Sequence, residues 1–182
     1  MKRGALVLLV LVVAGCGGDK TAKSGCQPFG GGTTARKSAS SPSQTMLLTA
    51  VGTESDACSD RVTFDFKDAN GAEPGYHVEY RPAEEAQTED ASGNHIPIDG
   101  DAFLVVRFEP AATADISGAK LERTYTGPRT IKPDGMQWVE QVSKTGDFEA
   151  VLTWAIGLEE KVDFRVTTAA SPSRLIVDFR NH

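Results

Sequence analysis

The sequence is poor in the residues from which catalytic and metal sites are commonly built. Its 182 residues include three cysteines and three histidines, and one histidine, His182, is terminal. His77 and His95 lie near turns and are expected to be exposed, and no nucleophile-elbow sequence is present. There is no C-x-x-C motif, no zinc-ligand spacing and no EF-hand loop. We therefore expect no enzyme activity, no metal and no cofactor.

Long apolar runs are confined to the N-terminus. Lys2 and Arg3 precede an apolar stretch at residues 5–13, which is typical of a secretory signal and too short for a membrane-spanning helix. Val13-Ala14-Gly15-Cys16 resembles a bacterial lipobox, which predicts cleavage after residue 15 and lipidation of Cys16, with chains such as palmitate. Two acyl chains hold a protein stably on a membrane. An ordinary signal with an incidental cysteine is the alternative.

Basic residues are scarcer than acidic ones in this sequence. The formal net charge of −6 becomes −8 when Lys2 and Arg3 are removed with the signal, which argues against nucleic-acid binding.

If Cys16 is lipidated, Cys26 and Cys58 remain, and in an oxidising compartment such a pair most simply forms a disulfide. This bridge would contribute about 3–4 kcal/mol in the chain-entropy model. Two free thiols are the alternative.

The remaining chain divides into a linker and one β-rich domain. Residues 16–45 are expected to be the lipidated cysteine and a flexible linker, because Gly, Ser and Thr dominate. No helical stripe of three turns follows, although residues 110–118 could hold one or two helical turns. Residues 46–182 predict an antiparallel β-sandwich of roughly 8–10 short strands. The predicted strands are residues 46–51, 61–66, 76–80, 94–98, 102–108, 120–126, 137–143, 148–156, 162–168 and 175–179.

Exposed aromatic rings and arginines are the candidate ligand-binding residues. Sugars commonly stack on exposed Trp or Tyr rings, and the candidates are Tyr76, Tyr125 and Trp138. Tyr125 stands in a turn beside Arg129. The rings of Tyr125 and Trp138 could instead complete the core. Arg129 and Arg107 could recognise a carboxylate, or pair with acids within the sheets. Trp154 lies on a strand face with apolar neighbours and is expected in the core.

Several blocks of the body together resemble a known family. They are Asp60-Arg61-Val62-Thr63-Phe64-Asp65-Phe66, Pro74-Gly75-Tyr76-His77-Val78-Glu79-Tyr80, Gly100-Asp101-Ala102-Phe103-Leu104-Val105-Val106-Arg107, Thr124-Tyr125-Thr126-Gly127-Pro128, Gly146-Asp147-Phe148-Glu149, Val151-Leu152-Thr153-Trp154-Ala155-Ile156-Gly157-Leu158, Phe164-Arg165-Val166 and Arg174-Leu175-Ile176-Val177-Asp178. Because these blocks occur together in this order, the chain resembles the actinobacterial AMIN-like domain lipoproteins. Cys58, just ahead of the first block, departs from the pattern expected for them.

The resemblance implies a function in the cell envelope. The related AMIN domain is a β-sandwich that targets catalytic modules such as cell-wall amidases to peptidoglycan or the septum. It implies no established ligand residues. We expect a monomer anchored by lipid to the extracytoplasmic face of the cell membrane, which binds peptidoglycan or another cell-wall glycan. Alternatives are a protein–protein adaptor that positions an envelope enzyme or transporter, and a carrier with a small-ligand pocket.

Overall fold

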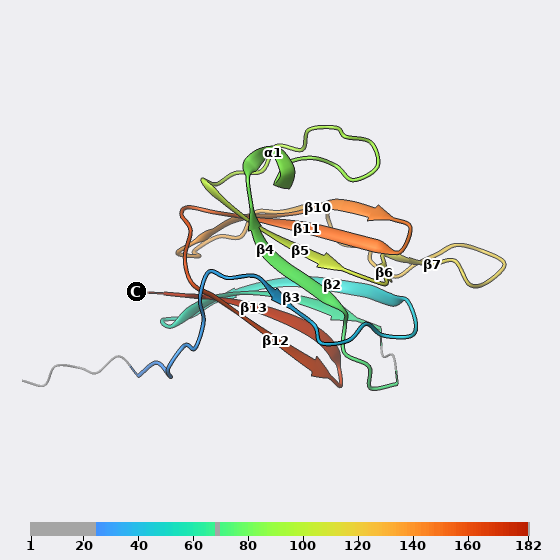
Figure 1. Ribbon diagram of the computed structural model, residues 1–182, viewed down its shortest axis with the longest axis horizontal. Helices are drawn as coiled ribbons and strands as arrows, with labels where there is room; N and C mark the ends of the chain where they lie inside the picture. The colour runs from blue at the N-terminus through green and yellow to red at the C-terminus, as the bar shows by residue number, and fades with distance from the viewer. Residues whose placement is uncertain (1–24, 68–69, 182) are drawn as a thin grey trace, which may run out of the picture.

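The computed structural model of the chain describes residues 25–67 and 70–181 and places two β-sheets face to face (Figure 1). The six-stranded sheet has the order β1-β4-β5-β11-β10-β9, and the five-stranded sheet has the order β12-β13-β3-β2-β6. A separate two-stranded ladder joins β7 to β8. The all-β antiparallel sandwich expected from the sequence is thus confirmed, with one parallel pairing between β2 and β6.

The element bounds show that most strands are long and continuous. They are β1 Arg36–Lys37, β2 Met46–Ser55, β3 Ser59–Phe66, β4 Tyr76–Arg81, α1 Ala83–Ala86, β5 Ala102–Phe108, β6 Ala111–Ala112, β7 Ala114–Asp115, β8 Glu122–Arg123, β9 Thr130–Ile131, β10 Val139–Phe148, β11 Val151–Leu158, β12 Phe164–Ala170 and β13 Ser173–Arg180. In the described part of the chain, no helix is long and apolar enough to cross a membrane.

The core lies between the two sheets, and large aromatic side chains fill it. On β3, buried and partly exposed residues alternate strictly, as period-2 side-chain orientation requires. The Phe64 ring meets Phe108 edge-on at 5.1 Å and Trp154 at 5.9 Å, measured between ring centroids. From Leu152 to Leu158, β11 is buried on both faces because a second apolar cluster, with Ala86 and Phe103, covers its outer side.

Asp60 links the sheets at one end of the sandwich. Its side chain is fully buried. One carboxylate oxygen accepts hydrogen bonds from the backbone N–H groups of Trp138, at 2.7 Å, and Val139, at 3.3 Å. The other accepts from the Ser55 hydroxyl at 2.7 Å and from the Asn181 amide at 3.3 Å. A buried carboxylate is tolerated where donors surround it in this way.

Two predictions of local structure are wrong, and a third is confirmed only in part. Residues 94–98 form no strand, and their one ladder contact is an isolated bridge between His95 and Thr88. Residues 110–118 hold no helical turn, because β6 pairs with the start of β2, and β7 pairs with β8. Within residues 120–126, only Glu122–Arg123 is a strand. β6 pairs with a strand far away in the sequence, whereas β7 pairs with β8, and His95 with Thr88, over short separations.

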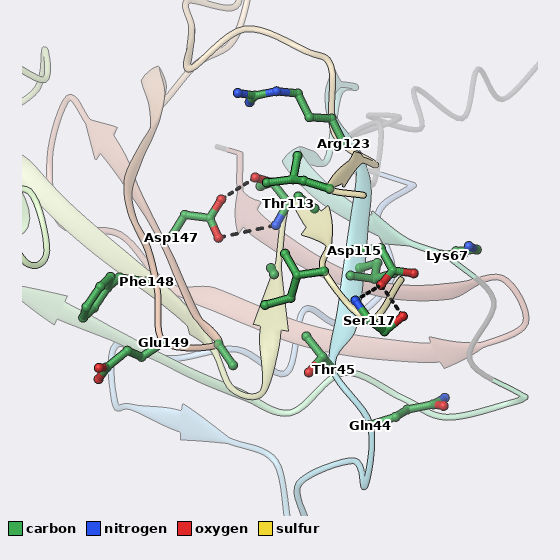
Figure 2. Close-up of a pocket in the computed structure, with 16 residues that line it drawn as sticks. Gln44, Thr45, Lys67, Thr113, Asp115, Ser117, Arg123, Asp147, Phe148 and Glu149 are labelled. Atoms are coloured by element: carbon green, nitrogen blue, oxygen red, sulfur yellow. Dashed lines mark hydrogen bonds between the residues drawn. The ribbon is translucent and has the colours of Figure 1, made fainter. Parts of the chain in front are cut away.

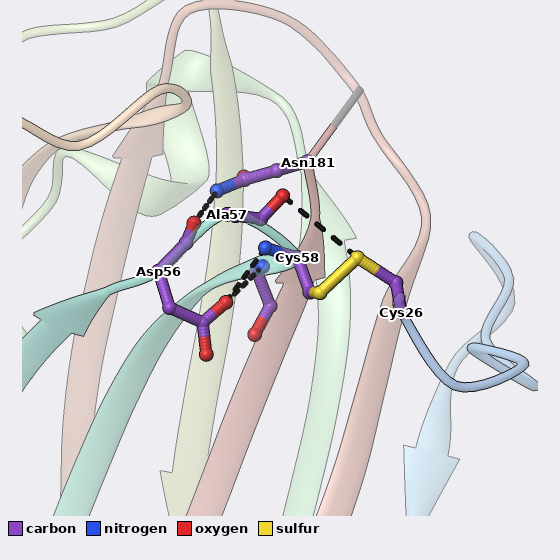
Figure 3. The surroundings of a disulfide bond; sticks show 6 residues. Cys26, Asp56, Ala57, Cys58 and Asn181 are labelled. Atoms are coloured by element: carbon purple, nitrogen blue, oxygen red, sulfur yellow. Dashed lines mark hydrogen bonds between the residues drawn. A yellow bond between two sulfur atoms is a disulfide. The ribbon is translucent and has the colours of Figure 1, made fainter. Parts of the chain in front are cut away.

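The segment before β2 is bonded to the sandwich rather than free throughout. A disulfide joins Cys26 to Cys58, with the two Cα atoms 5.5 Å apart, which confirms the expected pairing (Figure 3). Gly32 and Phe164 exchange two backbone hydrogen bonds, and β1 pairs with β4. The expected linker is therefore partly attached to the body. The predicted lipidation site, Cys16, lies outside the described residues.

Candidate functional site

Exposed apolar side chains gather in one groove at an end of the sandwich. Among residues 25–67 and 70–181, the exposed large hydrophobic side chains are those of Ile116, Leu121 and Phe148, with 78%, 62% and 55% of their surface exposed. All three line the same groove, which has a volume of about 770 Å³ (Figure 2). Its walls come from the start of β2, the residue after β3, the β6–β8 segment and the β10–β11 turn. We call it the hairpin groove.

The β10–β11 turn forms one wall of the groove in an unfavourable backbone conformation. Glu149 and Ala150 both have positive φ angles, 51° and 60°, where Asn and Gly are the usual residues. A side chain in this region costs roughly 1–2 kcal/mol per residue. The N–H of Ala111 donates to the carbonyl of Ala150 at 2.8 Å and helps to hold the turn. The turn carries Phe148 and Glu149 along one side of the groove in Figure 2.

Two of the groove's carboxylates are already occupied by neighbouring groups. Asp147 accepts a short hydrogen bond from the Thr113 hydroxyl and forms an ion pair with Lys144 at 3.4 Å. Asp115 accepts from the hydroxyl of Ser117 at 2.6 Å and from its backbone N–H at 2.9 Å. These bonds, helped by the charge of Lys67, hold the pKa of Asp115 below its usual value. Both acids are therefore fixed parts of the wall.

The remaining charges of the groove have no such partner. Among the arginines that the structure describes, every guanidinium has a hydrogen-bond or ion-pair partner except those of Arg123 and Arg180. Arg123 lines the groove, whereas Arg180 ends β13 at the opposite end of the sandwich. Glu149 lines the groove as well and makes no ion pair within the described chain. Lys67 lines the groove too and acts on Asp115, so Arg123 and Glu149 are the cation and the anion that the groove offers a ligand beside its apolar surface.

Tyr125 and Trp138 do not form an exposed stacking surface, and of the two alternatives for these rings the structure has the core position. Their exposed fractions are 7% and 6%, and both belong to the core. The Tyr125 ring packs edge-on against Trp154 at 5.6 Å, and its hydroxyl donates to the carbonyl of Pro128 at 2.8 Å. The Trp138 indole N–H donates to the carbonyl of Arg180 at 2.8 Å. Both rings close the sandwich, so neither presents a face to a sugar.

The other expected ligand residues lie apart from the groove and from one another. Tyr76 is half-buried and packs against the core. Arg107 forms an exposed ion pair with Glu109 at 3.0 Å, beside a shallow depression on the outer face of the six-stranded sheet. Arg129 pairs with Glu89 at 2.5 Å. The Ser92 hydroxyl, with Arg129 and Asn94, lowers the pKa of Glu89 to about 2, so this pair stays charged.

The residues of the groove were not singled out from the sequence. A signal for them does exist, because Ile116 and Leu121 are large aliphatic residues within a stretch otherwise rich in Gly, Ser, Asp and Lys. Such residues have no strand alternation to place them in a core. Among residues 25–67 and 70–181, no group of three or more His, Cys, Asp or Glu side chains could hold a metal ion.

Comparison with known proteins gives one match. Residues 46–181 match the family model of the AMIN-like domain, which is associated with cell-wall related binding and is of a non-catalytic, binding type. Searches of curated proteins and of solved structures found no match. The matched region spans more than half of the sequence and contains every strand of both sheets except β1, together with most of the groove. The chain therefore belongs to the AMIN-like family.

Proposed function

We propose that this protein is a lipid-anchored, non-catalytic envelope protein that binds peptidoglycan through the hairpin groove. The observation that carries the proposal is the meeting of Ile116, Leu121 and Phe148 with the unpaired Arg123 in one open groove. Exposed apolar side chains that cluster in this way mark interaction sites more often than scattered ones do. Membership of the AMIN-like family supports a wall polymer as the ligand.

The chemistry of peptidoglycan suits this groove. Its stem peptides present carboxylates, and a guanidinium binds a carboxylate through two parallel hydrogen bonds. A ring such as that of Phe148 can pack against the apolar face of a sugar or against an alanine methyl group. Because Asp115 and Asp147 are held by their own partners, Arg123 is left free to bind an anionic ligand group.

The proposed location rests on the sequence before the described residues. The basic start, the short apolar run and the small residues before Cys16 support cleavage and lipidation there. Acyl chains on Cys16 would hold the domain at the outer face of the cell membrane as a peripheral, non-spanning protein. Intact mass of protein extracted from membranes tests this step, since retained residues 1–15 without lipid mass would contradict it.

Binding of the purified full-length protein to peptidoglycan tests the groove. We expect saturable binding, and a roughly tenfold weaker affinity for Phe148→Ser or Arg123→Ala, since a central interface contact is worth about 1–2 kcal/mol. Arg180→Ala is the matched control, because this guanidinium is also unpaired but lies at the far end. No saturable binding would overturn the proposed ligand. Binding that the groove variants leave unchanged would overturn the proposed site.

The adaptor function remains a second candidate, and the aliphatic nature of Ile116 and Leu121 favours it. Both lie between β7 and β8, in the segment that projects from the sandwich in Figure 1. Apolar side chains at such a position are typical of contacts with another protein. A photo-crosslinking residue at Ile116 in intact cells separates the two functions. A crosslink to one protein favours the adaptor, and a crosslink to wall material favours peptidoglycan.

A further inference from the structure

The hairpin groove and the disulfide lie at opposite ends of the sandwich. Strand β2 begins at the groove, where Leu47 lines the wall, and ends at Ser55, three residues before Cys58. Ten residues of β2 span about 30 Å at the usual rise per residue. The N–H of Asn181 donates to the carbonyl of Cys58 at 3.0 Å, so the C-terminus lies at the disulfide end, and Figure 1 shows the β7 segment at the other end.

The disulfide also determines how short the connection to the proposed anchor is. Nine residues separate Cys16 from Cys26, whereas the sandwich proper begins at Met46. The flexible linker expected from the composition would have a root-mean-square length of about 16–19 Å over the ten steps from Cys16 to Cys26, and of about 27–33 Å over the thirty steps to Met46. The shorter length is well below the span of β2, and the longer one is comparable with it.

The hydrogen bonds after Cys26 do not replace the disulfide. The next backbone attachment is the pair of hydrogen bonds between Gly32 and Phe164, worth about 0.5–1.5 kcal/mol each. The Arg165 guanidinium also donates to the carbonyl of Phe29 at 3.2 Å and lies over its ring. Ordering the residues between Cys26 and Gly32 costs about 1–2 kcal/mol per residue, which offsets these few contacts. The following attachment, β1, pairs with Val78 and His77 within β4, away from the disulfide end.

We infer that the Cys26–Cys58 disulfide makes the disulfide end of the sandwich the surface that faces the lipid bilayer, so that the hairpin groove points away from the membrane toward the wall. This inference rests on the lipid anchor of the proposed function. A tether shorter than the body keeps its attachment point nearest the membrane, because the body cannot enter the bilayer. A tether as long as the body permits all orientations.

Energy transfer in vesicles tests the orientation. The full-length lipidated protein is reconstituted in vesicles with acceptor-labelled lipids, and a donor dye is placed by click chemistry at Ala119, near the groove, or at Glu160, near the disulfide end. Both positions are exposed. We expect transfer from position 160 to exceed transfer from position 119 at least twofold. Equal transfer, or more transfer from position 119, would overturn the inference.

Two variants test the role of the disulfide itself. Cys26→Ser with Cys58→Ser should bring the two transfer efficiencies closer together. Insertion of twenty Gly and Ser residues between Cys16 and Cys26 should do the same with the disulfide intact, which separates tether length from any loss of folding. If both variants keep the twofold difference, the inference is wrong. If Cys16 carries no lipid and the protein does not bind vesicles, both the proposed anchor and this inference are wrong. Peptidoglycan binding is measured in a separate experiment, so that part of the proposed function is tested independently.

Discussion

At the scale of single residues, Asp60 holds the two sheets together. Replacing it with Ala would leave the buried N–H groups of Trp138 and Val139 without an acceptor. Each such group costs about 1–3 kcal/mol, so we expect Asp60→Ala to lower the free energy of unfolding by roughly 3 kcal/mol in urea titrations. The exposed Asp163 provides the control, and Asp163→Ala should change stability by less than about 0.5 kcal/mol.

Asp60→Asn refines the same prediction. The amide keeps one acceptor oxygen for the two backbone donors, while its NH₂ can donate to the Ser55 hydroxyl. Asp60→Asn should therefore lower the free energy of unfolding less than Asp60→Ala does, but more than Asp163→Ala does. A loss below 1 kcal/mol for Asp60→Ala would show that the carboxylate does not link the sheets energetically.

At the scale of elements, the β10–β11 turn contains residues that do not suit its backbone conformation, which lowers the stability of the protein. Ala150 has a φ of 60°, which Gly adopts without a steric penalty. Ala150→Gly should therefore raise the free energy of unfolding by about 1 kcal/mol, which corresponds to a melting temperature about 2–4 °C higher for a domain of this size. The same change in an extended strand, Ala169→Gly in β12, should destabilise the protein by roughly 0.5–1 kcal/mol. A lower melting temperature for Ala150→Gly would contradict the argument.

The elements also show which local signals in the sequence suffice to predict structure. Clean alternation predicted β3, and β4 and β5 followed from apolar residues at every second position, because these residues meet the core. Alternation is weak in residues 110–126, and there the pairing of β6 with β2 and of β7 with β8 decides the structure. The turns beside Tyr125 and Trp138 make both residues candidates for exposed positions. They are buried because those turns fold over the sandwich edge, which periodicity does not reveal.

At the scale of the whole molecule, the candidate site is an assembly of distant segments. The start of β2, the end of β10 and the β7–β8 connection lie up to about a hundred residues apart along the chain and meet only in the folded structure. Composition could identify Ile116 and Leu121 as unusual loop residues, but not that Phe148 and Arg123 join them. The disulfide was accessible from the sequence because only two cysteines remained once Cys16 was assigned to the lipid.

The disulfide should stabilise the fold without contributing to the groove. It joins residues 32 apart, and closing a loop of this size removes about 3–4 kcal/mol of unfolded-state entropy. Cys26→Ser with Cys58→Ser should therefore lower the free energy of unfolding by that amount in urea titrations. Peptidoglycan affinity measured below the unfolding transition should stay within about twofold, because sites this far apart rarely couple. A tenfold loss of affinity in the folded double variant would mean that the two ends communicate, and that the disulfide does more than fasten the tether.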